Sequence, residues 1–199
     1  VQQDLFDMSQ RLRVPLEDTA KLFTRMSVPL QRMGVGIKDT EKVVGAFSTA
    51  LKLAGATGQE ASSAMLQFSQ SINAGRLNGG EFNSIAEASP NILRAIEAEL
   101  IRTGRAAELS SKGLKKMASD GKLTTDVLVS ALKNAAPQWQ KDFESLPITV
   151  DGALTRIKNA WNKAIGELGQ NTKFNEEIAK SLKKVEDILP VVAEAFANA

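Results

Sequence analysis

The fold class follows from residues 46–85, AFSTALKLAGATGQEASSAMLQFSQSINAGRLNGGEFNSI. Apolar side chains recur there every three or four positions, the spacing that brings them to one face of an α-helix. Thr57 and Glu60 form the pattern of a capping box, in which each side chain accepts a hydrogen bond from a free backbone N–H at the helix start. Gly55 and Gly75 stand where helices are expected to end. The stretch therefore predicts helices separated by short turns.

The same signals continue on both sides of this stretch, and no alternation typical of β-strands appears in the sequence. Pro15 is expected to start a helix, Pro90 to start or kink one, and Pro29 to interrupt or bend one. Asn78 is expected to cap the helix that follows it. Only 5% of the residues are aromatic, so the core must be built mainly from aliphatic side chains, a mixture that favours helices over sheets. The sequence predicts an all-α fold.

Two prolines mark the expected internal boundary, because Pro137 is expected to open a short turn and Pro147 to close it. The predicted division is leading helices over residues 1–36, a compact helical domain over 37–136, a proline-bounded linker over 137–149 and the start of a long helical, coiled-coil-like region over 150–199. The chain opens on valine and closes within a helical pattern. We expect it to be a piece of a longer protein.

In the last of these ranges, apolar residues are spaced mainly by four and three positions in turn, which is the heptad pattern of a seam between helices. One run comprises Val150, Leu154, Ile157, Trp161 and Leu168, and the next comprises Phe174, Ile178, Leu182, Val185, Leu189, Val192 and Phe196. Each run holds only about three heptads, so an antiparallel helix pair and a coiled coil both fit. The expected architecture is a compact multi-helix domain followed by long amphipathic helices with heptad-like packing.

Composition argues against catalysis and against nucleic-acid binding. The chain has neither histidine nor cysteine, which removes the commonest general base, the commonest metal ligand and the thiolate nucleophile. We therefore expect no catalytic residue, no cofactor and no metal site. The net charge is +2, and the basic run over residues 102–122 has no interleaved aromatic residue for base stacking, so we interpret it as a solvated helical face. No apolar run approaches the roughly 20 residues of a membrane span.

Three blocks of sequence carry a more specific signal. The first contains residues 66–70 (LQFSQ), 74–79 (AGRLNG) and 81–85 (EFNSI); the second is residues 118–124 (ASDGKLT) with Ala131 and Leu132; the third is residues 152–161 (GALTRIKNAW). In this order and spacing the blocks resemble the N-terminal tape measure domain of the tail tape measure proteins of long-tailed phages and prophages. The resemblance spans residues 20–166.

This resemblance implies a structural component of a phage or prophage tail that scaffolds tail tube assembly and sets tail length, and not an enzyme. It implies tail tube, tail chaperone and tail tip proteins as partners, together with possible self-association through helices in residues 150–199. The implied locations are the virion tail and, during assembly, the cytoplasm of the host bacterium. The family-motif structural residues taken from the blocks are Phe68, Gln70, Gly75, Leu77, Gly79, Glu81, Phe82, Gly121, Leu154 and Trp161.

Within the first block, Gly75 and Gly79 are expected to bracket a turn that needs a positive φ angle or a close approach of other atoms. Leu77 is expected to anchor this turn between the adjoining helices, and Phe68 and Phe82 are expected to pack across the same junction. Two other function classes remain as alternatives. One is a bacterial helical adaptor, a protein-interaction domain that presents a groove to a partner peptide; the other is a lytic hydrolase domain.

Overall fold

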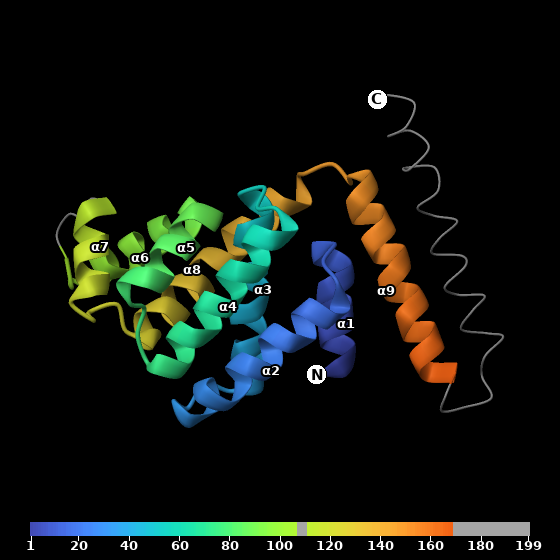
Figure 1. Cartoon of the computed structure of the whole chain (residues 1–199), viewed down its shortest axis with the longest axis horizontal. Coiled ribbons are helices and arrows are strands. Elements are labelled where there is room, and N and C mark those ends of the chain that lie inside the picture. The colour runs from blue at the N-terminus through green and yellow to red at the C-terminus, as the bar shows by residue number, and fades with distance from the viewer. Residues whose placement is uncertain (107–110, 169–199) are drawn as a thin grey trace. The chain divides into compact units, whose positions relative to one another are not determined.

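The computed structural model describes residues 1–106 and 111–168 (Figure 1). Within these residues the chain forms α-helices and no β-strand, which confirms the all-α prediction. The helices are α1 (Gln2–Leu12), α2 (Leu16–Arg32), α3 (Ile37–Leu53), α4 (Gly58–Ala74), α5 (Gly79–Ala88), α6 (Pro90–Arg102), α7 (Ser111–Ser119), α8 (Thr125–Glu144) and α9 (Val150–Leu168). The predictions for residues 107–110, and for the apolar run from Phe174 to Phe196, lie outside the described residues.

Contacts divide the chain into two compact units, which we describe one at a time. The larger unit comprises residues 20–145, and the smaller combines residues 1–19 with residues from 146 onward. The boundary between them falls near the start of α2 and in the segment between α8 and α9. The four domain ranges expected from the sequence remain a prediction.

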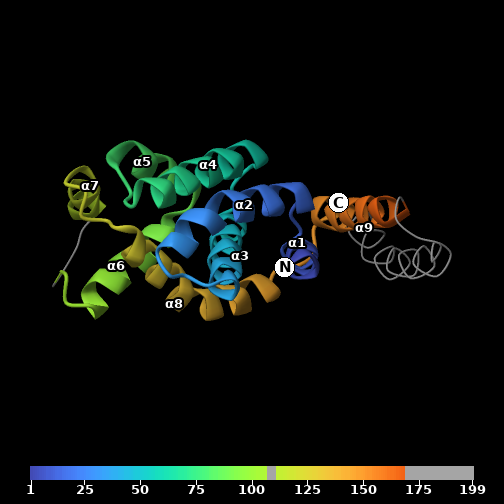
Figure 2. The ribbon, with the colours of Figure 1, turned by 90° about the horizontal axis from the view of Figure 1, so that it is seen from below.

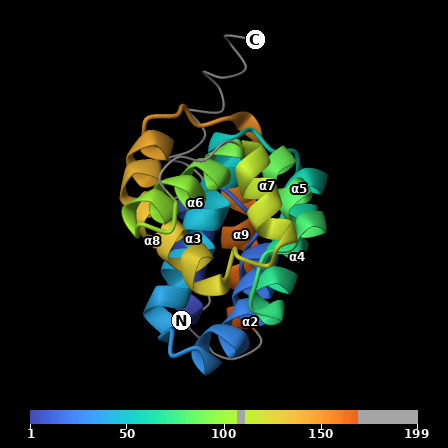
Figure 3. The same cartoon turned by 90° about the vertical axis from the view of Figure 1, so that its left-hand side faces the viewer.

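The core of the larger unit is built around α8, which packs against both α3 and α6 (Figure 3). Helix α5 in turn contacts α4, α6 and α7 (Figure 2). The rings of Phe47 and Phe68 stack with their centroids 4.1 Å apart and their planes at 10°, which ties α3 to α4. Full burial of a side chain of this kind contributes roughly 1.5–3 kcal/mol. Other fully buried side chains of this unit include Met26, Leu30, Leu51, Ile72, Ile85, Ile92, Ile96 and Leu100.

The helix ends near the first block mostly follow the predicted signals. The capping box is present: the Glu60 N–H donates to Thr57 Oγ1 at 3.4 Å, and the Thr57 N–H donates to Glu60 Oε2 at 2.8 Å. Gly75 ends α4 in the left-handed conformation, with φ of 77°. Helix α5 begins directly after Asn78, but the Asn78 side chain makes no capping hydrogen bond, so the prediction for that side chain is wrong.

The predictions for the prolines are correct at the helix starts and wrong at Pro137. Helix α6 begins at Pro90, and α2 begins directly after Pro15, as expected. Helix α2 is not interrupted at Pro29, and α8 continues through Pro137, where a turn was expected. Only residues 145–149 separate α8 from α9.

The reason for the continuous α8 is burial on both sides of its proline. Leu128 and Leu132 before Pro137, and Trp139 and Phe143 after it, are buried and keep helical spacing across it. Pro137 itself lies on the exposed side of the helix. An internal proline costs about 3 kcal/mol, and the burial of two aromatic side chains beyond it is enough to offset that cost.

A buried carboxylate joins α6 to α8. The side chain of Glu99 is only 4% exposed. It accepts hydrogen bonds from Arg102 Nε at 2.9 Å, from Arg102 Nη2 at 2.6 Å and from Asn134 Nδ2 at 2.8 Å. The hydrogen bonds from Arg102, which outweigh the desolvation of the carboxylate, lower the pKa of Glu99 to about 2. The folded chain therefore favours the ionised form.

We predict that Glu99→Gln lowers the free energy of unfolding by about 2 kcal/mol at neutral pH, because an amide cannot replace the charged acceptor. The pKa of Glu99 is lowered from its usual value of 4.5 to about 2, so the stabilisation is fully present above pH 4.5 and is lost as the pH falls towards 2. Urea unfolding followed by circular dichroism between pH 7 and pH 2 should show the difference between variant and parent shrinking over that window.

Glu97→Gln is the matched control, because Glu97 is a half-buried glutamate on the same helix that makes no ion pair with another described residue. The control should change the unfolding free energy by less than about 0.5 kcal/mol. A Glu99→Gln difference that stays constant between pH 7 and pH 2 would contradict the assigned role of the ionised carboxylate.

Candidate functional site: the contacts of the motif blocks

The turns of the first and second blocks meet in the larger unit. The Leu77 N–H donates to the Leu123 carbonyl at 2.7 Å, and the Thr125 N–H donates to the Gly75 carbonyl at 3.0 Å. A single antiparallel β-bridge lies between these two bonds. We call this contact, made by residues 75–77 and 121–125, the block junction. It joins two segments that are far apart in the sequence, backbone to backbone.

The block junction is buried at its centre, and other side-chain atoms lie close to Gly121 and to the nearby Gly79. Leu77 and Leu123 are both fully buried. Gly121 has φ of 68°, and a Cβ atom added there would lie 3.1 Å from Nη1 of Arg76. A Cβ atom on Gly79 would lie 3.3 Å from Oγ of Ser119, a residue of the second block. The backbone conformation at 121 therefore favours glycine, and a Cβ atom there would also make the Arg76 side chain shift; close packing constrains Gly79.

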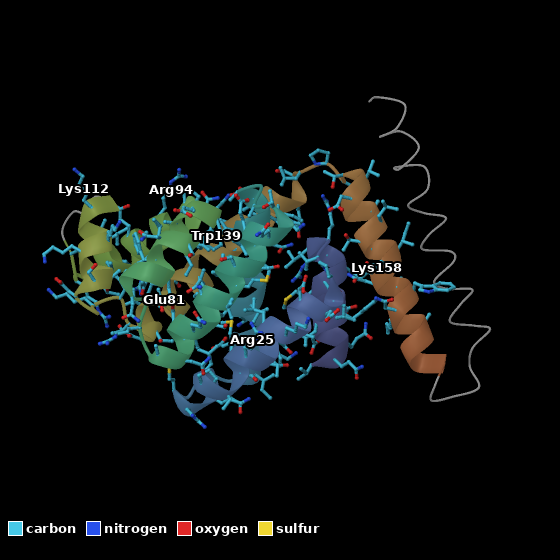
Figure 4. All side chains as sticks on the ribbon, in the orientation of Figure 1. Arg25, Glu81, Arg94, Lys112, Trp139 and Lys158 are labelled. Atoms are coloured by element: carbon cyan, nitrogen blue, oxygen red, sulfur yellow. The ribbon has the colours of Figure 1, made fainter. Side chains whose placement is uncertain are left out.

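The other assigned residues of the first block occupy different environments. Phe68 and Phe82 are both buried, and the ring of Phe68 stacks on that of Phe47. Gln70 is exposed on α4, and Glu81 is half-buried in the first turn of α5 (Figure 4). The structure thus brings Gly75, Leu77 and Gly121 to the block junction, places Gly79 close to Ser119 of the second block, and leaves Gln70 in solvent. The shared role assigned to these residues remains a prediction.

The third block belongs to the smaller unit, where α9 packs antiparallel to α1. Gln10 Nε2 donates to the Arg156 carbonyl at 3.0 Å, and Lys163 Nζ donates to Gln3 Oε1 at 3.0 Å. A Cβ atom on Gly152 would lie 2.8 Å from Cδ of Arg13, so a larger residue would push this contact apart. The Arg13 guanidinium also donates to the carbonyl of Pro147 at 2.8 Å.

Asn159 is the buried polar centre of this contact. Its side chain accepts a hydrogen bond from the Leu16 N–H at 2.9 Å and donates to the Val14 carbonyl at 2.7 Å and to Ser9 Oγ at 3.3 Å. It is only 2% exposed. The side chain therefore satisfies backbone groups in the turn from α1 to α2, including one of the free N–H groups at the start of α2.

The buried role of Asn159 was not predicted, because a lone asparagine in an amphipathic helix is usually solvated. The available signal was its neighbourhood: Gly152, Ala153 and Ala160 are small and buried, and they share its side of α9. A helix face of small residues permits close approach of another helix, and a polar residue on such a face needs a partner.

The two assigned residues of α9 lie elsewhere on the helix. Leu154 is 55% exposed and Trp161 is 60% exposed. The face that α9 turns towards α1 is instead the face of small residues and Asn159. The predicted heptad seam is therefore distinct from the α1 contact, and its role remains a prediction.

Charge in the basic run is largely balanced within the chain. Four of its six cations lie within 4 Å of a carboxylate: Arg102 with Glu99, Arg105 with Asp126, and Lys116 and Lys122 with Asp120. Hydrogen bonds from Thr124 and Arg105 lower the pKa of Asp126, against the effect of desolvation. This balance agrees with the interpretation of the run as a solvated helical face.

No group of three or more aspartate and glutamate side chains that could hold a metal ion occurs in the described part of the chain. Among the helices described, none is both long and apolar enough to cross a membrane.

A comparison with protein-family models gives one informative match: the family described as "Tape measure protein" matches residues 1–170. The matched range includes all three blocks and every helix that the structure describes. No curated protein and no solved structure matches the chain.

We predict that Gly121→Ala lowers the free energy of unfolding by about 1–2 kcal/mol, because the left-handed conformation is strained for alanine and Arg76 must move. Gly80→Ala is the control: a Cβ atom there meets nothing within 4 Å, and alanine favours a helix over glycine. Chemical unfolding of both variants measures the difference. Equal stability of the two variants would show that the block junction relaxes around the added methyl group.

We also predict that Asn159→Ala lowers the free energy of unfolding by about 2 kcal/mol, because it leaves the Leu16 N–H and the Val14 carbonyl without their partner. Hydrogen exchange at the Leu16 amide should become faster. Asn162→Ala, an exposed position on the same helix, should leave both quantities nearly unchanged. Unchanged exchange at Leu16 in the Asn159 variant would contradict the bridging role.

Proposed function

Because the chain belongs to the tape measure protein family, we propose that it scaffolds assembly of a phage or prophage tail tube and sets the length of that tail. The family match carries this proposal, since it covers every described helix and all three motif blocks. The family is a structural one, and the proposal includes no catalytic step.

A helix offers a physical basis for measuring length. Each residue adds about 1.5 Å along the axis, so the number of residues in an extended helical segment converts linearly into distance. We propose that the range 150–199 begins this measuring rod. Its first part is α9, which Asn159 and Gln10 hold against α1. The residues before about 149 would then form a head from which the rod extends.

The proposed partners follow from this role. They are tail tube, tail chaperone and tail tip proteins, and further copies of the chain, which would associate through helices in residues 150–199. The proposed locations are the virion tail and, during assembly, the cytoplasm of the host bacterium. The exposed Leu154 and Trp161 support an intermolecular contact on α9, because large apolar side chains in solvent mark interaction surfaces.

We predict that inserting 70 residues of continuous helical heptads after residue 168 of the natural gene lengthens the tail by about 105 Å, at about 1.5 Å per residue. Insertion of 35 residues should give about half that increase. Negative-stain electron microscopy of particles from the phage or prophage that encodes the chain measures the tail lengths.

The control is an insertion of 70 glycine- and serine-rich residues at the same point, which lacks a defined helical rise. It should broaden the distribution of tail lengths without the same fixed increment. Tails whose length is unaffected by either helical insertion would contradict the measuring role. Tails that fail to assemble in every variant would contradict the proposal that the rod runs through residue 168.

A further inference from the structure

The turn between α4 and α5 contains the dipeptide Asn78-Gly79, and no other asparagine of the chain is followed by glycine. Among the asparagines that the structure describes, Asn78 alone lies outside a helix. Its side chain is half-buried and makes no capping hydrogen bond. Asparagine is a thermolabile residue, and its short side chain reaches the backbone of neighbouring residues. The side-chain amide of Asn78 is therefore free to react with the backbone that follows it.

The backbone nitrogen of Gly79 is free as well. Gly79 is the first residue of α5, and the first N–H groups of a helix have no partner within that helix. The Gly79 N–H donates to no acceptor in the described part of the chain. Glycine also has no Cβ atom that would hinder the approach of a neighbouring group to its nitrogen. The turn thus places an unbonded nucleophile directly after an unbonded side-chain amide.

Two nearby asparagines show what distinguishes this turn. Asn83 is exposed, but it lies inside α5, where the N–H of the next residue donates to a carbonyl four positions back. Asn91 lies in the first turn of α6, and the N–H of Ile92 after it donates to the Ser89 carbonyl at 3.1 Å. Exposure alone therefore does not make an asparagine reactive, because at both positions the following nitrogen is engaged.

We propose that Asn78 is a site of spontaneous covalent modification, at which the asparagine is converted to aspartate and isoaspartate with water as the only co-reactant. The Gly79 nitrogen attacks Cγ of Asn78: a new C–N bond forms, the bond from Cγ to the amide nitrogen breaks, and ammonia leaves with the proton of Gly79. Water then opens the five-membered ring at one of its two carbonyl carbons. Opening at Cγ gives aspartate. Opening at the backbone carbon gives isoaspartate, in which Cγ becomes part of the main chain.

The block junction controls how readily this reaction takes place. Ring closure requires the Gly79 nitrogen to rotate towards the Asn78 side chain, away from the extended ψ angle of 173°. That rotation is opposed by the hydrogen bond from the Phe82 N–H to the Asn78 carbonyl at 2.9 Å, and by the closeness of Gly79 to Oγ of Ser119. On the other side, Leu77 is held by its bond to the Leu123 carbonyl. The reaction therefore proceeds through local opening of the turn, and a looser junction speeds it.

The two products act on the turn in opposite directions. Aspartate places a negative charge directly before α5, close to the free N–H groups of the helix, where a carboxylate is favourable. Isoaspartate lengthens the main chain between Leu77 and Gly79 by one carbon, so either the block junction or the start of α5 must shift. The reaction belongs to the chain itself and does not depend on the role in tail assembly, so its test and that of the proposed function fail separately.

The first experiment is incubation of the whole folded chain at mildly alkaline pH, where the Gly79 nitrogen loses its proton more readily, followed by peptide mass spectrometry. Trypsin releases residues 77–94 as one peptide, which contains Asn78, Asn83 and Asn91. Modification at Asn78 should be faster than at either of the others by about tenfold or more, and the product should take up heavy oxygen from labelled water. Equal rates at Asn78 and Asn83 would overturn the proposal.

A matched pair of variants tests the route through the ring. Gly79→Ala should slow modification at Asn78 by about tenfold, because its Cβ atom hinders attack by the nitrogen. Gly80→Ala is the control, since a Cβ atom there meets nothing within 4 Å, and its rate should stay within about twofold of the parent. The comparison is repeated in urea, where every chain is unfolded, so that it holds even if the contact with Ser119 makes Gly79→Ala unstable. Equal rates for the parent and Gly79→Ala in urea would exclude the proposed route.

Loosening the block junction tests its control of the reaction. Gly121→Ala should speed modification at Asn78 severalfold in the folded chain, and this difference should disappear in urea. In the isoaspartate form, separated from the unmodified chain after incubation, hydrogen exchange at the Leu77 amide should be faster than in the parent. Asn78→Asp, which represents the other product, should leave that exchange nearly unchanged. A rate in folded Gly121→Ala equal to that of the parent, or equal Leu77 exchange in the isoaspartate form, would overturn the link to the block junction.

Discussion

The hydrogen bond from the Leu77 N–H to the Leu123 carbonyl is the contact on which the motif region of the larger unit depends. Leu77 is fully buried and lies outside any helix, so its N–H has no helical partner and must find one elsewhere. The pairing with Leu123 supplies that partner, and it fixes the end of α4, the start of α5, the end of α7 and the start of α8 together. Three glycines make this contact possible. Gly75 and Gly121 adopt positive φ angles, and Gly79 leaves room for the Ser119 side chain.

The sequence predicts the helix starts and ends that depend on residues close together in the chain. The capping box at Thr57 and Glu60, the end of α4 at Gly75 and the start of α6 at Pro90 each depend on atoms a few positions apart. The block junction depends on two segments whose proximity no local pattern encodes. At Pro137 the local sequence rule gives the wrong answer. It predicts a turn, but the burial of Trp139 and Phe143 after the proline keeps α8 continuous.

Helix α9 shows what a hydrophobic pattern detects and what it misses. The heptad spacing correctly indicates a line of large apolar residues, but it does not say which element covers them. The face that α9 turns towards α1 is made of Gly152, Ala153 and Ala160 around the buried Asn159. Small residues contribute little to a periodicity dominated by leucine, isoleucine and tryptophan, yet they allow the closest approach of two helices. The contact with α1 therefore could not be found from apolar spacing alone.

The two faces of α9 differ in the interactions they make, so a contact on one face need not disturb the other. The α1 face relies on close fit and on buried hydrogen bonds from one asparagine, which tolerate little change in geometry. The other side of the helix carries the exposed Leu154 and Trp161, which take no part in those hydrogen bonds. Because the hydrogen bonds of Asn159 are on the far side of the helix, covering Leu154 and Trp161 removes apolar surface from water without breaking any of them. A helix arranged in this way stays anchored to its own chain while its outward side leaves Leu154 and Trp161 exposed.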